Sequence, residues 1–182
     1  MRKIIVNIAT SADGFIARAD DDIEWLTSRP KPKGFYGMGD FMKSIDTLLL
    51  GRRTYEISRR LGGTFKSKTR TIVFSRNPPP ADAPSGVEFV GDPIGEFVSR
   101  LREQPGKNMW LMGGGELIAS LLDERLIDEF VITMMPVFIG DGIPLIARRA
   151  REVLLDLQSV ERFEDGVVQL HYGVQYHTCK DH

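Results

Sequence analysis

The sequence has few of the residues that build metal centres and disulfide frameworks. It contains one cysteine, Cys179, and three histidines, of which His177 and His182 stand near the end of the 182-residue chain. A single cysteine cannot form an intramolecular disulfide, and a cysteine-rich zinc site needs several thiolates. We therefore expect neither a disulfide-stapled fold nor a metal enzyme.

An excess of charge and long hydrophobic runs are also missing. The 24 basic and 25 acidic side chains leave a net charge of −1, which makes the chain a poor binder of nucleic acid or of an anionic membrane surface. No apolar run reaches the roughly 18 residues of a spanning helix, and the N-terminus lacks the arrangement of a signal peptide. These absences predict a soluble, cytoplasmic protein.

The hydrophobic pattern that is present predicts one α/β domain over residues 1–182. Apolar or β-branched runs typical of buried strands occur at 3–9, 47–50, 69–75, 87–90, 108–112 and 130–135. Apolar residues at helical spacing occur between and after them, at 35–45, 52–61, 94–101 and 117–122. In the last quarter, two strand-like runs flank the turn 164–166. The pattern predicts a mostly parallel sheet flanked by helices, with a C-terminal antiparallel hairpin.

The segment 20–34 stands out because it contains three consecutive aspartates, two prolines and little periodicity. Such composition predicts a loop, interrupted by the short apolar stretch 23–26. Its length suggests that the loop closes over a binding site.

Two junctions join a strand, glycine and the start of a helix. At the carboxyl ends of parallel strands, helix N-termini offer unpaired N–H groups and a positive dipole to ligands. At the first junction, Gly51 permits close approach of a phosphate, and Arg52, Arg53 and Thr54 supply charge and hydrogen-bond donors. The alternative is an exposed, basic first turn of a helix.

The second junction, Gly113-Gly114-Gly115, permits the approach of a flat ligand or a pyrophosphate, although three glycines can also serve a tight turn. These glycines form neither a Gly-x-Gly-x-x-Gly fingerprint nor a P-loop with its Lys-Ser or Lys-Thr pair, which disfavours a standard Rossmann domain. Ser75-Arg76 follows a strand and could bind the extra phosphate of NADPH. An exposed arginine at such a place is otherwise commonplace.

Five segments in order extend these observations to nearly the whole chain. They are 9–17, 46–56, 71–76, 113–117 and 127–145. Together they resemble the C-terminal reductase domain of the bifunctional riboflavin-biosynthesis deaminase-reductase, within the dihydrofolate reductase-like fold. The resemblance implies an NADPH-dependent reductase with a dihydrofolate reductase-like mixed sheet.

The resemblance also implies which residues bind the cofactor. Ala9, Ile16 and Ala17 would lie near the nicotinamide, and Gly51, Arg52, Arg53 and Thr54 would hold the pyrophosphate. Ser75 and Arg76 would take the adenosine 2′-phosphate. Gly113, Gly114, Gly115, Glu116 and Leu117 would pass under the cofactor, the glycine pair matching one that a cis peptide joins in dihydrofolate reductases.

Substrate and acid positions follow from the same resemblance. Trp25 and Thr27 belong to a stretch similar to one that borders the substrate in riboflavin reductases. Tyr36 lies near the position where dihydrofolate reductases carry a carboxylate, and Asp40 is the nearest acid. Asp13 matches an aspartate of both groups, so Asp13 and Asp40 are the candidate catalytic acids. An exposed helix acid is otherwise often solvated, and an aspartate beside a glycine often stabilises its own turn.

The expected function is NADPH-dependent reduction of a small pyrimidine-like heterocycle, of the 5-amino-6-(5-phosphoribosylamino)uracil type. The Arg-Arg-Thr-Tyr-Glu sequence at 52–56 is typical of dihydrofolate reductases, so a dihydrofolate or pterin reductase stays open. A non-catalytic, dimeric NADPH-binding protein is the other alternative. Apolar residues within 130–146, among them Met135 and Phe138, suggest a homodimer. The zinc-ligand signature of a deaminase is absent.

Overall fold

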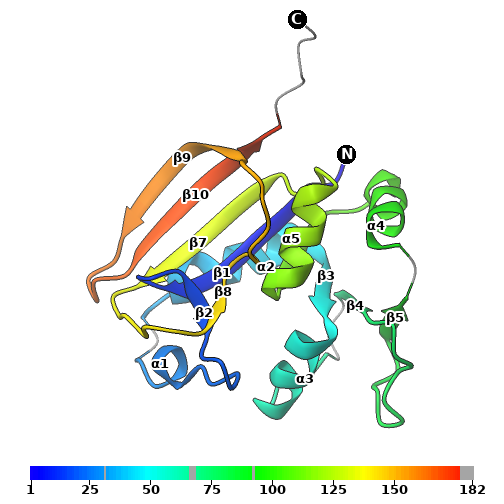
Figure 1. The fold of residues 1–182 in the computed structure, drawn as a ribbon, viewed down its shortest axis with the longest axis horizontal. Helices are drawn as coiled ribbons and strands as arrows, with labels where there is room; N and C mark the ends of the chain where they lie inside the picture. Colours follow the sequence, from blue (N-terminus) through cyan, green and yellow to red (C-terminus); the bar gives the residue numbers. More distant parts are fainter. Residues whose placement is uncertain (31, 66–68, 92, 177–182) are drawn as a thin grey trace, which may run out of the picture.

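The computed structural model describes residues 1–30, 32–65, 69–91 and 93–176 (Figure 1). Cys179, His177 and His182 lie outside the described residues. Within the described ranges, no helix is long and apolar enough to cross a membrane.

An eight-stranded sheet forms the centre of the molecule, in the order β5-β4-β3-β6-β1-β7-β10-β9. Its strands are β1 (Ile4–Ser11), β3 (Ile45–Gly51), β4 (Arg70–Phe74), β5 (Val87–Val90), β6 (Asn108–Gly113), β7 (Glu129–Met135), β9 (Leu154–Arg162) and β10 (Val168–Gln175). All pairs from β5 to β7 are parallel, whereas β10 runs antiparallel to β7 and to β9. The predicted mixed sheet with its C-terminal hairpin is therefore confirmed.

A second, small sheet was not expected from the sequence. It consists of β2 (Phe15–Ala17) and β8 (Ile143–Pro144), which pair antiparallel. These strands hold the segment after β1 against the segment after β7.

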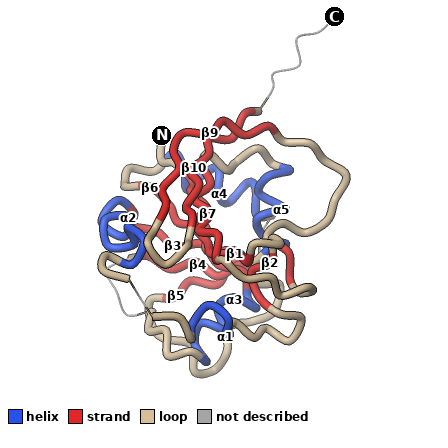
Figure 2. The backbone as a smooth tube through the Cα atoms, turned by 90° about the vertical axis from the view of Figure 1, so that its left-hand side faces the viewer, coloured by secondary structure: helices blue, strands red, loops and turns tan. Residues whose placement is uncertain are grey.

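Helices cover both faces of the large sheet, as Figure 2 shows for α2 on one side and α4 and α5 on the other. They are α1 (Glu24–Thr27), α2 (Met38–Ser44), α3 (Arg52–Arg60), α4 (Ile94–Glu103) and α5 (Gly115–Asp123). Alternation along β3 explains the two layers. Leu49 packs into the core beneath α4 and α5, whereas Leu50 packs with Tyr55 of α3. Each fully buried side chain of this kind contributes about 1.5–3 kcal/mol.

The continuous helix expected over 35–45 is wrong. Positive φ angles at Gly34 (81°), Tyr36 (54°) and Gly37 (75°) interrupt helical geometry. A 3₁₀ turn, η1 (Phe35–Gly37), therefore precedes α2, and Ile45 begins β3 instead of ending the helix. Glycine tolerates such angles because it lacks a Cβ, so the glycines at 34 and 37 set this boundary.

Candidate active site

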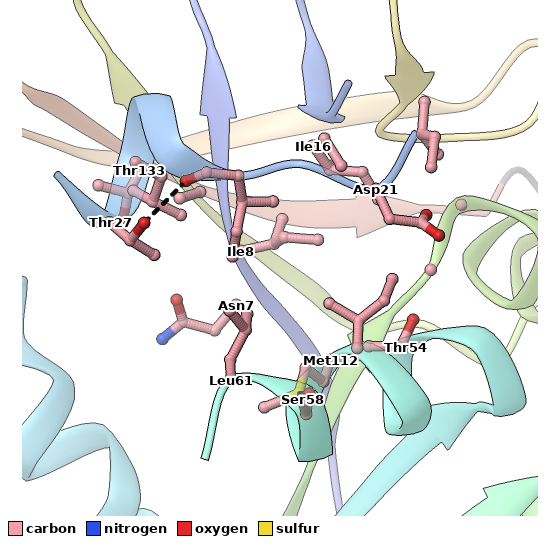
Figure 3. A pocket seen from close by; sticks show the side chains of 18 of the residues that line it. Asn7, Ile8, Ile16, Asp21, Thr27, Thr54, Ser58, Leu61, Met112 and Thr133 are labelled. Atoms are coloured by element: carbon pink, nitrogen blue, oxygen red, sulfur yellow. Dashed lines mark hydrogen bonds between the residues drawn. The ribbon is translucent and has the colours of Figure 1, made fainter. Parts of the chain in front are cut away.

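A cavity of about 630 Å³ lies at the carboxyl ends of the central strands. Its walls come from α3, from the N-terminus of α5 and from the segment that contains α1 and η1. Figure 3 shows Thr27 of α1 on one side of this space and Thr54 and Ser58 of α3 on another. A largely apolar cavity with a few polar groups at strand ends is typical of ligand sites in open α/β sheets.

The two glycine junctions meet at this cavity. β3 and β6 are neighbours, and their register pairs Leu50 with Gly113. A Cβ placed on Gly51 would lie 3.7 Å from both the Gly113 oxygen and the Gly114 nitrogen. The Gly113–Gly114 peptide bond is cis. The missing side chains thus leave a gap between two backbone turns, each of which leads into a helix.

Most of the residues expected at the cofactor line the cavity. They are Ala9, Ile16, Ala17, Gly51, Arg52, Arg53, Thr54, Gly114, Gly115, Glu116 and Leu117. Gly113 directly precedes Gly114 in the chain, and its register partner Leu50 directly precedes Gly51. The sheet topology brings these residues together, because β1, β3 and β6 are close neighbours whose carboxyl ends share one edge.

Ser75 and Arg76 lie at the same edge of the sheet but are not among the residues that line the cavity. They follow β4, whose last residue, Phe74, is the register partner of Gly51. The Ser75 hydroxyl donates to the Asn77 oxygen at 2.9 Å, and Arg76 is exposed. Arg52 Nη1 donates to the Pro78 oxygen at 2.9 Å, which ties this turn to α3.

Asp21, which the sequence did not single out, joins the loop to the first junction. Its carboxylate lies 2.6 Å from Arg53 Nε and 3.9 Å from Arg60 Nη2, and Asp21 also lines the cavity. Arg53 Nη2 donates to the Ala19 oxygen at 3.3 Å. The segment 19–21 is therefore fastened to α3 at the rim of the cavity.

Of the three residues expected at the substrate, two line the cavity and one does not. Thr27 and Tyr36 line the cavity, whereas Trp25 is buried behind it, in a cluster with Met135 and Val167. The Tyr36 hydroxyl donates to Asp165 Oδ2 at 2.5 Å. Burial, which has the largest effect, and the hydrogen bond to Asp165 together raise the pKa of Tyr36 to about 12.

Neither candidate acid is among the lining residues. Asp13 accepts hydrogen bonds from the backbone N–H groups of Gly140, at 2.8 Å, and Ile139, at 3.2 Å. The Ser11 hydroxyl and these backbone donors lower the pKa of Asp13, so it is ionised at neutral pH. Asp40 is exposed on α2, where the ammonium of Lys43 at 2.7 Å lowers its pKa. The Asp13 carboxylate therefore stabilises a turn, and the Asp40 carboxylate forms a solvated ion pair.

Three uncharged polar residues of the sheet also line the cavity. They are Asn7 of β1, Thr133 of β7 and Gln169 of β10. Their convergence depends on the register of three strands, which no local pattern reveals. The available signal was the interruption of the apolar runs at 3–9 and 130–135 by a single buried polar residue in each. No group of three metal-binding side chains occurs among the described residues.

Comparison with known sequences identifies the family. The model of the family described as the RibD C-terminal domain matches residues 2–169. The chain is 37% identical over 171 residues to the uncharacterized protein YwjB of Bacillus subtilis strain 168. That match covers 94% of this chain and 97% of YwjB.

Solved structures agree. A Shewanella sp. PV-4 protein assigned to riboflavin biosynthesis superposes with a TM-score of 0.83 at 28% identity, over 96% of this chain and 99% of that one. The diaminohydroxyphosphoribosylaminopyrimidine deaminase/5-amino-6-(5-phosphoribosylamino)uracil reductase of Thermotoga maritima gives 0.72 at 17% identity, over 96% and 57%. Enterococcus faecalis dihydrofolate reductase, complexed with NADP(H), gives 0.62 at 20% identity, over 96% and 97%. The last two show a shared fold. The chain therefore belongs to the RibD C-terminal domain family and has the dihydrofolate reductase-like fold.

Proposed function

We propose that the protein is an NADPH-dependent reductase of a small pyrimidine-like heterocycle, of the 5-amino-6-(5-phosphoribosylamino)uracil type. The observation that carries the proposal is the meeting of two glycine turns and two helix N-termini at one cavity. Membership of the RibD C-terminal domain family supports it, as does the reductase activity named for the Thermotoga maritima protein. The NADP(H) complex of the dihydrofolate reductase with the same fold supports the choice of cofactor.

The residues present fit such a cofactor. The gap beside Gly51 and Gly114 would be filled by side chains at either position, and it lies at the N-termini of α3 and α5. These N–H groups, with Arg52 and Arg53, would hold the diphosphate. Ala9, Ile16 and Ala17 would border the nicotinamide, and Arg76 would meet the 2′-phosphate. NADPH, when bound, supplies a hydride.

The remaining lining residues would place the substrate and exclude water. Thr27 lies on α1 and Tyr36 on η1, whereas Asn7 and Thr133 lie on the sheet. Reduction of a C=N or C=O group also requires a proton. The positions of Asp13 and Asp40 outside the lining argue against the catalytic role expected for them, so we assign proton delivery to water.

The test is turnover by the complete chain with NADPH. Candidate substrates are 5-amino-6-(5-phosphoribosylamino)uracil and, as the alternative, dihydrofolate. We expect NADPH to raise the melting temperature and its absorbance to fall only when the pyrimidine is added. Absence of any NADPH-induced shift would overturn the proposal, and turnover of dihydrofolate alone would identify a folate reductase instead.

One observation favours a second candidate, a non-catalytic NADPH-binding protein. Both nominated acids are engaged elsewhere, as described above. This candidate predicts saturable NADPH binding without turnover of any pyrimidine, pterin or carbonyl compound. The homodimer and the cytoplasmic location expected from the sequence stay predictions.

A further inference from the structure

Asn7 is a buried polar side chain whose amide has no hydrogen-bond partner among the described residues. It is 7% exposed and lies in the middle of β1. Its backbone is held in place, since its carbonyl oxygen accepts a hydrogen bond from Trp110 Nε1 at 2.9 Å. Figure 3 shows its side chain in the cavity, between Thr27 and Leu61. Neither amide atom is among the fully buried side-chain atoms that lack a partner, so the amide borders the cavity, where its donor and acceptor are available to a ligand.

Two neighbouring strands add further uncharged groups on the same face of the sheet. Asn7 pairs in register with Val131, which places Thr133 two residues further along β7, and Gln169 of β10 lies opposite Thr133. Gln169 Nε2 donates to Thr133 Oγ1 at 2.9 Å and to the Tyr36 oxygen at 3.2 Å. These bonds leave the Thr133 hydroxyl hydrogen as a donor and Gln169 Oε1 as an acceptor.

The strands contribute no charged side chain to this cavity among the described residues. Its charged lining residues are Asp21, Arg29, Arg52, Arg53 and Glu116, which belong to loops and helix starts. Arg29 Nη2 donates to the Asp165 oxygen of the hairpin turn at 3.2 Å, whereas its buried Nε has no hydrogen-bond partner among the described residues. The side chains of Asn7, Thr133 and Gln169 therefore favour a neutral ligand group that offers both a hydrogen-bond donor and an acceptor.

We infer that Asn7 is a specificity-determining residue that recognises an uncharged amide or lactam edge of the ligand. Its amide N–H donates to the ligand carbonyl, and its amide oxygen accepts from the ligand N–H. The inference rests on the proposed function for the identity of this ligand as a substrate. Recognition itself is a binding property that needs no cofactor and no turnover.

Two planar probes of similar shape separate lactam recognition from apolar burial. Quinazolinedione carries two lactam carbonyls, and quinazoline carries none. Titration of the complete chain should give a dissociation constant at least about tenfold lower for quinazolinedione, the factor expected when a buried amide is paired rather than left unpaired. Asn7→Leu, which keeps the volume and removes the amide, should bind both probes equally.

The melting temperature of the variant and the NADPH binding of the chain separate loss of ligand recognition from loss of folding and from failure of the proposed function. Asn7→Leu removes an amide that makes no hydrogen bond with the described residues and keeps the backbone carbonyl that accepts from Trp110, so its melting temperature should not fall. Should this variant fail to fold, Asn7→Ala replaces it with the same expectation for the two probes. Equal binding of both probes by the wild type, no binding of either, or an unchanged preference in the variant would overturn the inference. A failure to bind NADPH, by contrast, bears on the proposed function alone.

Discussion

Arg53 and Asp21 form an ion pair, with 2.6 Å between Nε and Oδ1, at the rim of the cavity. Asp21 is only 17% exposed, so its charge is poorly screened by solvent. Arg53 is also one of the two guanidinium groups that we assign to the cofactor diphosphate. The same arginine thus fastens the loop in the free protein and would face an anion in the complex.

Asp21→Asn should therefore strengthen NADPH binding. Removal of a carboxylate near the diphosphate reduces repulsion, and the amide keeps an oxygen that can accept from Arg53. We expect affinity to rise about threefold to tenfold at low salt and the gain to shrink as salt is added. Asp20→Asn, a neutralisation in the same loop away from the lining, is the matched control and should change affinity less than twofold. Weaker binding by Asp21→Asn would mean that loop order outweighs charge.

Arg76 should set the preference for NADPH over NADH. Arg76 follows β4 at the edge of the sheet where Gly51 ends β3. A guanidinium group there can form an ion pair with the 2′-phosphate dianion of NADPH. Arg76→Ala should weaken NADPH binding about tenfold or more and leave NADH binding within twofold. Arg70→Ala, at the opposite end of the same strand, removes equal charge far from the site and should affect neither cofactor. An equal loss for both cofactors would place Arg76 elsewhere in binding or in folding.

The ion pairs of Glu129 should make stability depend on pH. Burial by itself would raise the pKa of this carboxyl, but hydrogen bonds from Lys3 and His171 outweigh burial and lower it. A lowered folded-state pKa stabilises the fold above the unfolded pKa, and this stabilisation is lost as the pH falls through the folded pKa.

Glu129→Gln should lower the unfolding free energy by about 1 kcal/mol near neutral pH, with a difference that disappears in acid. Urea unfolding over a series of pH values measures it. Glu88→Gln, which removes a more exposed partner of Arg70, should have an effect of about 0.5 kcal/mol or less. A Glu129 effect that stays constant in acid would contradict the ionic explanation.

The expected homodimer can be tested through its apolar surface. Within 130–146, Met135 is buried and cannot contact a partner, whereas Phe138 is 79% exposed. The edge strand β9 adds exposed Leu157 and Val160, an arrangement that monomers usually avoid. We expect light scattering to give the mass of a dimer and Leu157→Lys to give that of a monomer, with Met42→Lys on α2 as control. A wild-type chain that stays monomeric at all concentrations would contradict the expected homodimer.

Local patterns predicted the strands and the glycine junctions because both depend on residues near one another in sequence. The run at 47–50 followed by Gly51 contains a buried strand, a turn and a helix start within a few residues. The adjacency of that junction to Gly114 depends on the pairing of β3 with β6, which no local pattern reveals. The structure bears out the strand, the turn and the helix start.

Features that depend on register or on backbone angles could not be predicted in the same way. Asn7, Thr133 and Gln169 come together only through the pairing of β1, β7 and β10. Asp13 resembles a catalytic acid in sequence, yet its carboxylate accepts from the backbone of a turn more than a hundred residues away. Such long-range hydrogen bonds leave no trace in spacing or composition.

NADPH titration of the wild type and of Gly51→Ala is the measurement that tests the central claim most directly. The added Cβ would stand in ordinary van der Waals contact with the neighbouring turn and at a φ of −77°, so the fold should tolerate it. It would also crowd the backbone at the start of α3, where we propose that the diphosphate binds. Gly39→Ala, on exposed α2 with open space around the new Cβ, is the matched control.

We predict saturable NADPH binding by the wild type and by Gly39→Ala, with an affinity at least about tenfold lower for Gly51→Ala at an unchanged melting temperature. Equal NADPH affinity in all three proteins, or no binding by the wild type, would contradict the account.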